Sequence, residues 1–380
     1  MLYKNALIFL DNKFVKGSFR VENGTFTEVT ANSDLAAGDP ADVVDLCDAK
    51  VIPGLIDVHT HGNSGADFSD GDPAGVRKMA AYLAQEGITS FAPASMTLPY
   101  DVLDKAFRSG LALHKEMPAD HARLMGIQME GPFFSEKKKG AQNGAYLKDP
   151  DFDAFQKLYD GCEGLVRIAD VAPELPGAVE FTKKAATLCT VSIAHTDASY
   201  EDARAVIDAG CTHLTHLFNA MPPIHHRNPG VIGAASENDQ VTAEIICDGY
   251  HVHPSAIRMA FKLFPDRICL ISDSLRCCGM PDGKYELGGQ DVFLSGGLAR
   301  LADGTIAGSA SNLFTCMKNA IAFGIDEATA IIAATSTPAR EIGQDDKIGS
   351  IAPGKFADFV ICDDALNKQA VYIGGRKVTD

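Results

Sequence analysis

Apolar, strand-like runs alternate with helix-like segments over most of the chain, and no other feature limits the possible fold so strongly. Such alternation is typical of parallel strands that are connected through helices. Eight runs over about 290 residues predict an α/β fold, a (β/α)8 barrel of the TIM type. The runs are Leu55–His61, Ile88–Ala92, Leu124–Glu130, Val166–Ala172, Thr190–His195, His213–Leu217, Thr242–Cys247 and Ile268–Ser272.

A doubly wound open sheet shares this alternation. When it binds a dinucleotide, it carries a G-x-G-x-x-G turn after its first strand. No such turn follows the first run, so the barrel is the preferred prediction. The Gly-rich stretch 276–302 predicts a β-hairpin insertion after the eighth strand. Expected helices are Pro73–Glu86, Val102–Lys115, Phe152–Asp160, Gly177–Leu188, Glu201–Ala209, Pro254–Leu263, Ser311–Phe323 and Glu327–Ala334.

Short strand-like pieces without helical periodicity occupy both ends of the chain. They are Ala6–Leu10, Lys13–Arg20, Thr25–Val29, Val43–Asp45, Ala357–Cys362 and Ala370–Ile373. We therefore expect a small β-sandwich domain that is built from both termini around the central barrel. The predicted boundaries are 1–52 and 346–380 for the small domain and 53–345 for the barrel.

The chain is acidic, with 34 Lys and Arg against 50 Asp and Glu and a net charge of −16. This charge repels polyanions, so we expect neither nucleic acid nor a membrane surface as a partner. The ten cysteines show no C-x-x-C spacing, and most lie in apolar runs, which is typical of reduced thiols in a cytoplasmic protein. The apolar runs are too short for a signal-peptide core or a membrane span.

Two histidines end the first predicted strand, within the stretch Pro53–Gly62. Since side chains alternate along a strand, His59 and His61 point to the same side. Two imidazoles in this position can converge on one metal ion. For the motif taken alone, a surface His-x-His pair is the simpler interpretation.

Polar residues end other predicted strands at the corresponding place. They are Glu130 at the third strand, His195 at the fifth, His216 at the sixth and Asp273 at the eighth. The carboxyl ends of the strands form the active-site face of a barrel, so these side chains should meet the two histidines of the first strand. Each histidine alone is more simply a core residue. A cation, however, would relieve the cost of burying the carboxylate of Glu130. Together the residues predict a metal site.

Several other histidines compete for a role. His213 and His216 point to opposite faces of the sixth strand, and His216 is preferred because it lies nearer the strand end. The histidines interpreted as solvated or structural are His114, His121, His225, His226 and His253.

Mixed imidazole and carboxylate ligands suit zinc first and iron(II) second, and magnesium less. A metal of this kind lowers the pKa of bound water and polarises a carbonyl group. Asp273, placed opposite the ligands, is suited to take the proton from water and deliver it to a leaving amine. The predicted reaction is metal-assisted hydrolysis of an amide C–N bond.

Six motifs distributed over essentially the whole chain resemble one family. They are Pro53–Gly62, Met129–Phe133, Ala194–Thr196, His216–Met221, Asp248–His251 and Gly349–Asp358. They resemble the amidohydrolase superfamily and, within it, the N-acetylglucosamine-6-phosphate deacetylases. The resemblance implies conversion of N-acetylglucosamine 6-phosphate to glucosamine 6-phosphate and acetate, in amino-sugar catabolism or recycling.

The resemblance also implies Glu130, His195 and His216 as metal ligands and Asp273 as the general acid/base. Some members of the family lack the first-strand His-x-His pair and hold one metal ion, whereas others keep it and hold two. This chain keeps the pair. We therefore expect two ions, with His59 and His61 on one and Glu130 bridging.

For the substrate, the resemblance implies phosphate binding by Arg227 and His251, with Arg227 lent by the neighbouring subunit of a homodimer. A guanidinium fork matches phosphate oxygens and supplies the local cation that the net charge lacks. The other implied substrate-binding residues are Gln142, Asn219, Ala220 and the loop of Ile306, Ala307 and Gly308.

The chain departs from the family pattern in two places. Gln142 stands where some relatives have histidine, and it can bond a sugar hydroxyl but carries no charge. The run Ser274–Gly279 differs from the expected small residues, which makes Arg276 a candidate for a further phosphate or sugar contact.

Three alternatives compete with this function. The same chemistry could act on N-acetylgalactosamine 6-phosphate, or on a cyclic amide as in dihydroorotase-like enzymes. The latter carry a carboxylated lysine on strand four, and Val166–Ala172 contains no lysine. A metal-free scaffold without activity should lose ligands or the acid/base, and here all six residues are present.

Overall fold

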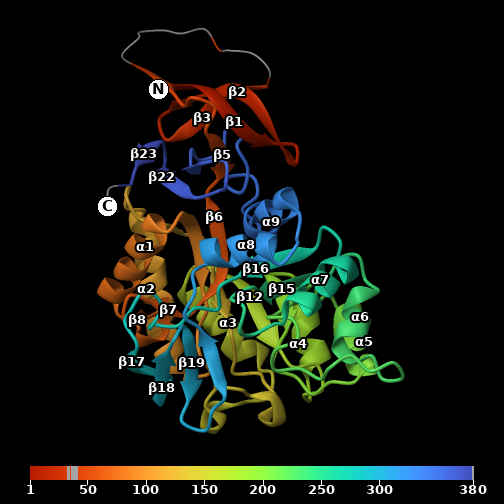
Figure 1. Cartoon of the computed structure of the whole chain (residues 1–380). Coiled ribbons are helices and arrows are strands. Elements are labelled where there is room, and N and C mark those ends of the chain that lie inside the picture. Colours follow the sequence, from red (N-terminus) through yellow and green to blue (C-terminus); the bar gives the residue numbers. More distant parts are fainter. Residues whose placement is uncertain (32–34, 36–41, 379–380) are drawn as a thin grey trace.

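Strands from both ends of the chain form one sheet in the computed structural model, which describes residues 1–31, 35 and 42–378 (Figure 1). Its order is β23-β22-β21-β5-β1-β2-β3, with β4 paired to β1. The expected pairing of strands from the two termini is therefore confirmed. The strands are β1 (Leu2–Leu10), β2 (Lys13–Glu22), β3 (Thr25–Ala31), β4 (Val43–Asp45), β5 (Lys50–Pro53), β21 (Phe359–Cys362), β22 (Lys368–Ile373) and β23 (Arg376–Lys377).

This terminal sheet curls around an aromatic core. Neighbouring strands lie about 4.8 Å apart, so Phe26 on β3 and Phe359 on β21 would be about 19 Å apart in a flat sheet. Their ring centroids are 6.0 Å apart. The rings of Tyr3 and Phe19 stack at 4.8 Å within the same core. The sheet therefore bends until its two halves face each other.

The chain passes from the terminal sheet into the parallel strands at Gly54. Strand β5 pairs antiparallel with β21, and β6 (Leu55–Thr60) begins two residues later and pairs with β9 (Ile88–Pro93). A Cβ atom at Gly54 would lie 2.0 Å from Oγ1 of Thr89. Only glycine fits this close approach, which brings the first histidine-bearing strand to its place.

A second group of strands is parallel and forms two hydrogen-bonded sheets. Their orders are β10-β9-β6 and β11-β12-β13-β14-β15-β16. Single parallel bridges, Ala94 with Gln128 and Thr60 with Ser274, connect the two sheets at either end. The result is a curled parallel sheet. The strands are β10 (Arg123–Leu124), β11 (Ile127–Met129), β12 (Val166–Val171), β13 (Thr190–Ile193), β14 (His213–Leu214), β15 (Thr242–Ile246) and β16 (Ile268–Ile271).

Two predicted strands are shorter in the structure. The expected third strand is interrupted between β10 and β11, and the expected sixth strand ends after Leu214. His216 has a left-handed backbone with φ of 30°. An extended strand cannot continue through such a residue, so the prediction of a strand to Leu217 was wrong.

Helices surround the parallel strands (Figure 1), and each expected helix is present with ends shifted by a few residues. Helix α1 begins with the Asp72 side chain accepting hydrogen bonds from the backbone N–H groups of Ala74 and Gly75. Helices α6 and α10 were not predicted, because seven and six residues are too short to show helical periodicity. The helices are α1 (Pro73–Gln85), α2 (Tyr100–Glu116), α3 (Phe152–Gly161), α4 (Ala178–Ala185), α5 (Tyr200–Asp208), α6 (Gly230–Ser236), α7 (Pro254–Leu263), α8 (Leu313–Ala322), α9 (Glu327–Ala334) and α10 (Ser336–Glu341).

The expected hairpin insertion is a four-stranded antiparallel meander. Its strands are β17 (Gly283–Leu287), β18 (Gln290–Ser295), β19 (Leu298–Leu301) and β20 (Ile306–Ser309). Residues Ile306–Gly308 therefore belong to a strand, and their assignment to a loop was wrong. The meander buries Leu287, Val292 and Leu294 against Met96, which anchors it beside the parallel strands.

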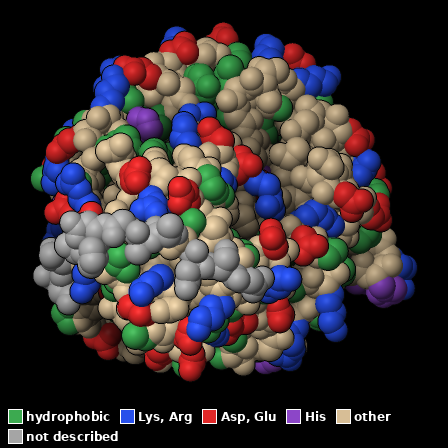
Figure 2. Space-filling model, turned by 90° about the horizontal axis from the view of Figure 1, so that it is seen from above, with side chains coloured by type: hydrophobic (Ala, Val, Ile, Leu, Met, Phe, Trp, Pro, Cys, Tyr) green, Lys and Arg blue, Asp and Glu red, His purple; other side chains and the backbone are tan. Residues whose placement is uncertain are grey.

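Short elements in the connections complete the fold: β7 (Gly62–Asn63), β8 (Ala66–Asp67), and the 3-10 helices η2 (Phe68–Asp70), η3 (Glu136–Lys138) and η4 (Gly144–Tyr146). In the view of Figure 2, acidic and basic side chains are interspersed over the surface. Among the described residues, no helix has the length and apolar character needed to cross a membrane.

Candidate metal centre

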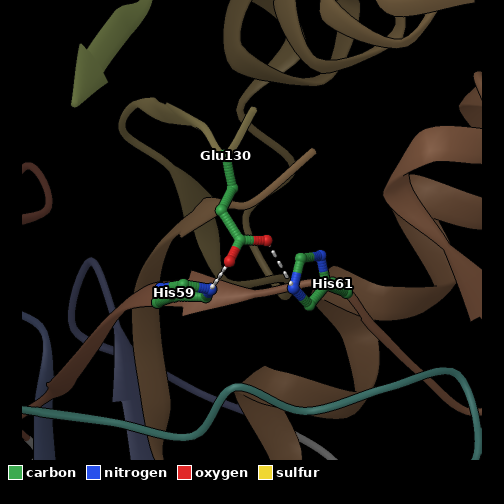
Figure 3. Close-up of side chains that lie close together, drawn as sticks. All are labelled: His59, His61 and Glu130. Atoms are coloured by element: carbon green, nitrogen blue, oxygen red, sulfur yellow. Dashed lines mark ion pairs between the residues drawn. The ribbon is translucent and has the colours of Figure 1, made fainter. Parts of the chain in front are cut away.

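Imidazoles and a carboxylate from separate strands converge at the carboxyl ends of the parallel strands. Two groups of metal-binding side chains form there, and the ligand atoms within each group lie within 4.8 Å of one another. One group is His59, His61 and Glu130, and the other is Glu130, His195 and His216. Figure 3 shows the Glu130 carboxylate between the two histidines of the first strand. The predicted cluster of five ligands is therefore brought together in space.

The shared carboxylate contacts both groups. Oε1 of Glu130 lies 3.0 Å from Nε2 of His195, 3.3 Å from Nε2 of His216 and 3.7 Å from Nε2 of His59. Oε2 lies 3.2 Å from Nε2 of His61. Glu130 thus stands where a bridging ligand would stand.

The hydrogen bonds behind the rings determine which nitrogens face the centre. Nδ1 of His195 lies 2.9 Å from the carbonyl oxygen of Lys138, and Nδ1 of His61 lies 3.1 Å from that of Ala94. A carbonyl oxygen only accepts hydrogen bonds, so each Nδ1 carries the hydrogen and each Nε2 of the neutral ring presents a lone pair.

Nitrogen and oxygen atoms face one another at short range. Nε2 of His195 and Nε2 of His216 are 3.2 Å apart, with a carboxylate oxygen beside them. Nε2 of His59 is buried and has no hydrogen-bond partner among the described residues. Lone pairs that converge in this way fit a cation, and this donor set is of the kind that binds zinc or iron(II).

Asp273 lies beside the two histidines of the first strand. Its Oδ1 is 3.4 Å from Nε2 of His61 and 3.7 Å from Nε2 of His59. Its backbone N–H donates to the carbonyl oxygen of His59 at 2.9 Å, and its own carbonyl accepts from Ser309 at 2.8 Å. The side chain is therefore held by strands on both sides.

Both carboxyl groups of the centre are ionised at neutral pH. Burial by itself raises the pKa of Glu130, but His61, His195 and His216 outweigh it and hold the pKa well below the ordinary value. Burial also raises the pKa of Asp273, but the neighbouring His61 and His59 lower it by more, so the net pKa lies below the ordinary value. The carboxylate of Asp273 is thus free to accept a proton.

Three residues of the centre have left-handed backbones. The φ angles are 43° for His195, 30° for His216 and 49° for Asp273. Each such conformation costs a non-glycine residue about 1–3 kcal/mol and clusters at functional sites. The turn directly after each strand directs its side chain over the end of the sheet.

A cavity of about 330 Å³ opens above the centre. Most of the predicted substrate residues line it. The lining residues are His61, Met96, Glu130, Gly140, Ala141, Gln142, His195, His216, Asn219, Ala220, His251, Asp273, Thr305, Ile306, Ala307 and Gly308. Met96 and Thr305 were not predicted, because each reaches the cavity only through the packing of the meander against the parallel strands.

Comparison with known proteins agrees with this geometry. A sequence model of the amidohydrolase family matches residues 50–378. The chain belongs to the amidohydrolase family. Among curated relatives, the N-acetylgalactosamine-6-phosphate deacetylase of Escherichia coli O157:H7 is 34% identical over 350 residues, which cover 91% of this chain and 93% of that protein. The N-acetylglucosamine-6-phosphate deacetylase of Bacillus subtilis is 34% identical over 367 residues, which cover 95% and 92%.

A solved structure is similar over the whole length. It is a variant of the N-acetyl-D-glucosamine-6-phosphate deacetylase of Mycobacterium smegmatis in complex with N-acetyl-D-glucosamine-6-phosphate. The TM-score is 0.92 at 31% sequence identity, and the match covers 100% of this chain and 99% of that chain. The parallel strands and the terminal sheet of this amidohydrolase therefore share one arrangement with that relative.

Gln142 of this amidohydrolase holds the central carboxylate. Its side-chain amide donates to Oε2 of Glu130 at 2.8 Å, and its carbonyl accepts from the backbone N–H of Thr97 at 2.7 Å. The side chain lines the cavity, but its hydrogen-bonding groups are engaged within the protein.

His251 in the cavity wall is paired with a carboxylate. Nδ1 of His251 lies 2.7 Å from Oδ2 of Asp248. Burial lowers the pKa of this imidazole, but the hydrogen bond and charge of Asp248 raise it by more, so the net pKa is raised. A charged imidazole at the wall of the cavity can meet an anionic group of a ligand.

The two arginines singled out in the sequence lie outside this cavity. Arg227 lines a separate hollow with Tyr200, and its guanidinium contacts Nε2 of His226 at 2.7 Å. Arg276 lies 2.8 Å from Oδ1 of Asp70 and 3.8 Å from Oδ2 of Asp67. Its guanidinium is paired with these carboxylates and does not line the cavity, so a substrate contact by Arg276 stays a prediction.

His213 faces away from the centre, as the preference for His216 requires. It is fully buried between the carboxylates of Glu244 and Glu341. Glu244 itself contacts His59 and was missed by the sequence analysis. The signal was present, because an acidic residue inside the apolar run Thr242–Cys247 needs a partner.

Proposed function

We propose that this amidohydrolase removes the acetyl group of N-acetylglucosamine 6-phosphate, which gives glucosamine 6-phosphate and acetate. One observation supports the proposal most directly: a cavity of sugar-phosphate size has a metal-type donor set at its base, Asp273 beside it and His251, paired with Asp248, in its wall. The relatives named above, which share about a third of their residues with this chain, support the same reaction. N-acetylgalactosamine 6-phosphate is the second candidate, because one relative is named for it.

The donor set suits one or two divalent ions, zinc first and iron(II) second. His59 and His61 would hold one ion, His195 and His216 the other, and Glu130 would stand between them. An ion bound there polarises the acetamide carbonyl and lowers the pKa of water towards neutrality.

The chain itself supplies the proton transfers and the positioning. The ionised carboxylate of Asp273 takes a proton from the attacking water and then donates it to the amine nitrogen as the C–N bond breaks. Gln142 keeps the Glu130 carboxylate in place through its amide hydrogen bond. Asn219, Ala220 and the strand Ile306–Gly308, which includes Ala307, enclose the sugar.

The phosphate group would be held by His251 and by Arg227 of a neighbouring subunit in a homodimer. None of the described residues that line the cavity is a lysine or an arginine. A phosphate dianion binds best to a guanidinium fork. Arg227 lies on an exposed segment outside the cavity of its own chain, a place from which it could reach a second copy.

We also propose how the sheets form two domains. The bridges at Ala94 and Thr60 would close eight parallel strands into a (β/α)8 barrel, and the curled terminal sheet would form a β-sandwich. The domain boundaries are 1–52 and 346–380 for the sandwich and 53–345 for the barrel.

The free cysteines, most of them buried, suit a cytoplasmic location.

Acetate release tests the function. The purified protein is given N-acetylglucosamine 6-phosphate, its galacto epimer and unphosphorylated N-acetylglucosamine in parallel. We expect kcat/KM to be highest for N-acetylglucosamine 6-phosphate and at least tenfold lower without the phosphate, since a charge-assisted contact contributes about 1.5–3 kcal/mol. A higher value for the galacto epimer would favour the second candidate. Release of acetate from none of the three would overturn the proposal.

A further inference from the structure

A buried carboxylate lies directly beneath the candidate metal centre and takes no part in the reaction described above. Glu244 on β15 is fully buried. Its Oε2 lies 2.9 Å from Nδ1 of His59 and accepts the backbone N–H of His216 at 3.1 Å. One side chain thus contacts two segments that carry candidate ligands.

The position is an unfavourable one for a charge. Thr242–Ile246 is buried along its whole length, and removing a carboxylate from water costs free energy unless its partners compensate. A valine or isoleucine at position 244 would meet the apolar pattern of the strand. The acidic residue is therefore better explained by what its oxygens hold than by the packing of the strand.

The carboxylate is backed by a second buried pair. Its Oε1 lies 3.1 Å from Nε2 of His213, and Nδ1 of His213 lies 2.8 Å from Oε2 of Glu341. Oε1 of Glu341 in turn accepts the hydroxyl of Thr242 at 2.8 Å. Carboxylates of this kind only accept hydrogen bonds, so both ring nitrogens of His213 donate and the ring is an imidazolium. These contacts hold the Glu244 side chain in place.

The consequence for His59 is a single tautomer. In the neutral ring, Nδ1 donates to Glu244 and Nε2 presents its lone pair, and this atom is buried without a hydrogen-bond partner among the described residues. It lies 3.7 Å from both Oε1 of Glu130 and Oδ1 of Asp273. The ring is held in the orientation that a cation between these oxygens requires.

We propose that Glu244, supported by His213 and Glu341, is a positioning residue that fixes the tautomer and orientation of His59 and so forms the ion position of His59, His61 and Glu130. The inference rests on the two-ion arrangement of the proposed function. Glu244 does not line the substrate cavity, so its effect on turnover passes through the candidate ligands that it contacts.

Calorimetric titration of the metal-free protein with Zn²⁺ tests the inference. Wild-type protein should take up two ions per chain. In the Glu244→Gln variant, one ion should bind within about threefold of the wild-type affinity and the other about 10- to 100-fold more weakly, the usual cost of losing the partner of a ligating histidine. Under zinc limitation, kcat should fall while KM for the phosphosugar stays within about twofold.

The matched control is Asp358→Asn. Asp358 is a buried carboxylate that pairs with Arg123 at 2.9 Å and does not contact the metal centre. This variant should lose stability and keep both zinc affinities. If Glu244→Gln does not fold, the Glu341→Gln variant is used instead, because Glu341 is less buried. Its Zn²⁺ affinity at the same ion position should be about three- to tenfold lower than in the wild type.

Each outcome decides a different point. Two ions in the wild type with unchanged affinities in the glutamine variant would overturn the role of Glu244 and leave the proposed function intact. A wild-type chain that binds one ion and releases acetate would overturn both the two-ion arrangement and this inference. Equal weakening in the Asp358→Asn control would show that lost stability alone explains the effect.

Discussion

The carboxyl ends of the parallel strands and the curled terminal sheet bury side chains of opposite kinds. The terminal sheet encloses rings such as Tyr3, Phe19 and Phe359, which pack face to face or edge to face. The strand ends enclose imidazoles and carboxylates whose lone pairs converge and whose backbones are strained. The first region gains stability from burial, whereas the second accepts a cost in stability for its chemistry.

This difference gives an expectation that can be tested. Changes at the strand ends should alter activity more than folding, and changes in the terminal sheet should do the reverse. The following experiments test this expectation, in order of decreasing effect on activity.

Removal of the metal should abolish activity. Exhaustive treatment with a chelator should lower the rate of acetate release about 10⁴-fold, because carbonyl polarisation and water activation are lost together. Added Zn²⁺ or Fe²⁺ should restore the rate, and metal analysis before and after gives the stoichiometry. Full activity in protein shown to contain no metal would contradict the assignment of the strand-end cluster.

Asp273→Asn should lower kcat about 10³-fold with the metal content unchanged, since the amide cannot accept the proton of water. Asp358→Asn, the matched loss of a buried carboxylate near the terminal sheet, should keep its kcat. Near-normal turnover in the Asp273 variant would remove this residue from the acid/base role.

Arg227→Ala should raise KM for the phosphorylated substrate about 10- to 100-fold and leave the unphosphorylated sugar unaffected. Chains of this variant co-expressed with Asp273→Asn chains test the homodimer directly. A hybrid dimer has one site with an intact Asp273 and an Arg227 from the other chain. An equal mixture should therefore recover about a quarter of wild-type activity. No recovery would place Arg227 in its own chain's site, and an Arg227→Ala variant with the wild-type KM would place it in neither site.

His251 should make binding of the phosphosugar dependent on pH. Its pKa is raised in the folded chain, so the charge is present at low pH and is lost as pH rises through that raised value. KM for the phosphosugar should rise about tenfold above this pH as the charged contact disappears. In His251→Gln, KM should be high throughout and flat with pH. The same slope in both proteins would exclude the imidazole as its cause.

Phe359→Ala should have the smallest effect on activity and the largest on stability. The ring is fully buried among the aromatic residues of the terminal sheet, so its loss should reduce the free energy of unfolding by about 3–5 kcal/mol. Urea unfolding measures this change, and kcat/KM below the transition should stay within about twofold. A thousandfold loss of kcat in folded protein would show that the two regions do not act separately.

The local sequence was sufficient wherever a pattern repeats at short range. Strand and helix alternation identified the parallel strands and most helices, and the terminal strands were identified by the lack of helical periodicity. His59, Glu130, His195 and Asp273 were found because each follows an apolar run, and the ends of parallel strands meet at one edge. Family motifs supplied most of the residues that line the cavity.

Tertiary structure decided which polar groups face one another. The Gln142 side chain donates a hydrogen bond to Glu130, and Glu244 is hydrogen-bonded to His59. Arg276 forms ion pairs with Asp67 and Asp70. These partners do not adjoin one another in the sequence. The strand at Ile306 and the wall at Met96 likewise depend on how the meander packs. The residues at the strand ends could be predicted from the strand pattern in the sequence. Their partners follow only from the packing, because a hydrogen bond depends on distances within a few tenths of an ångström and sequence spacing carries no such information.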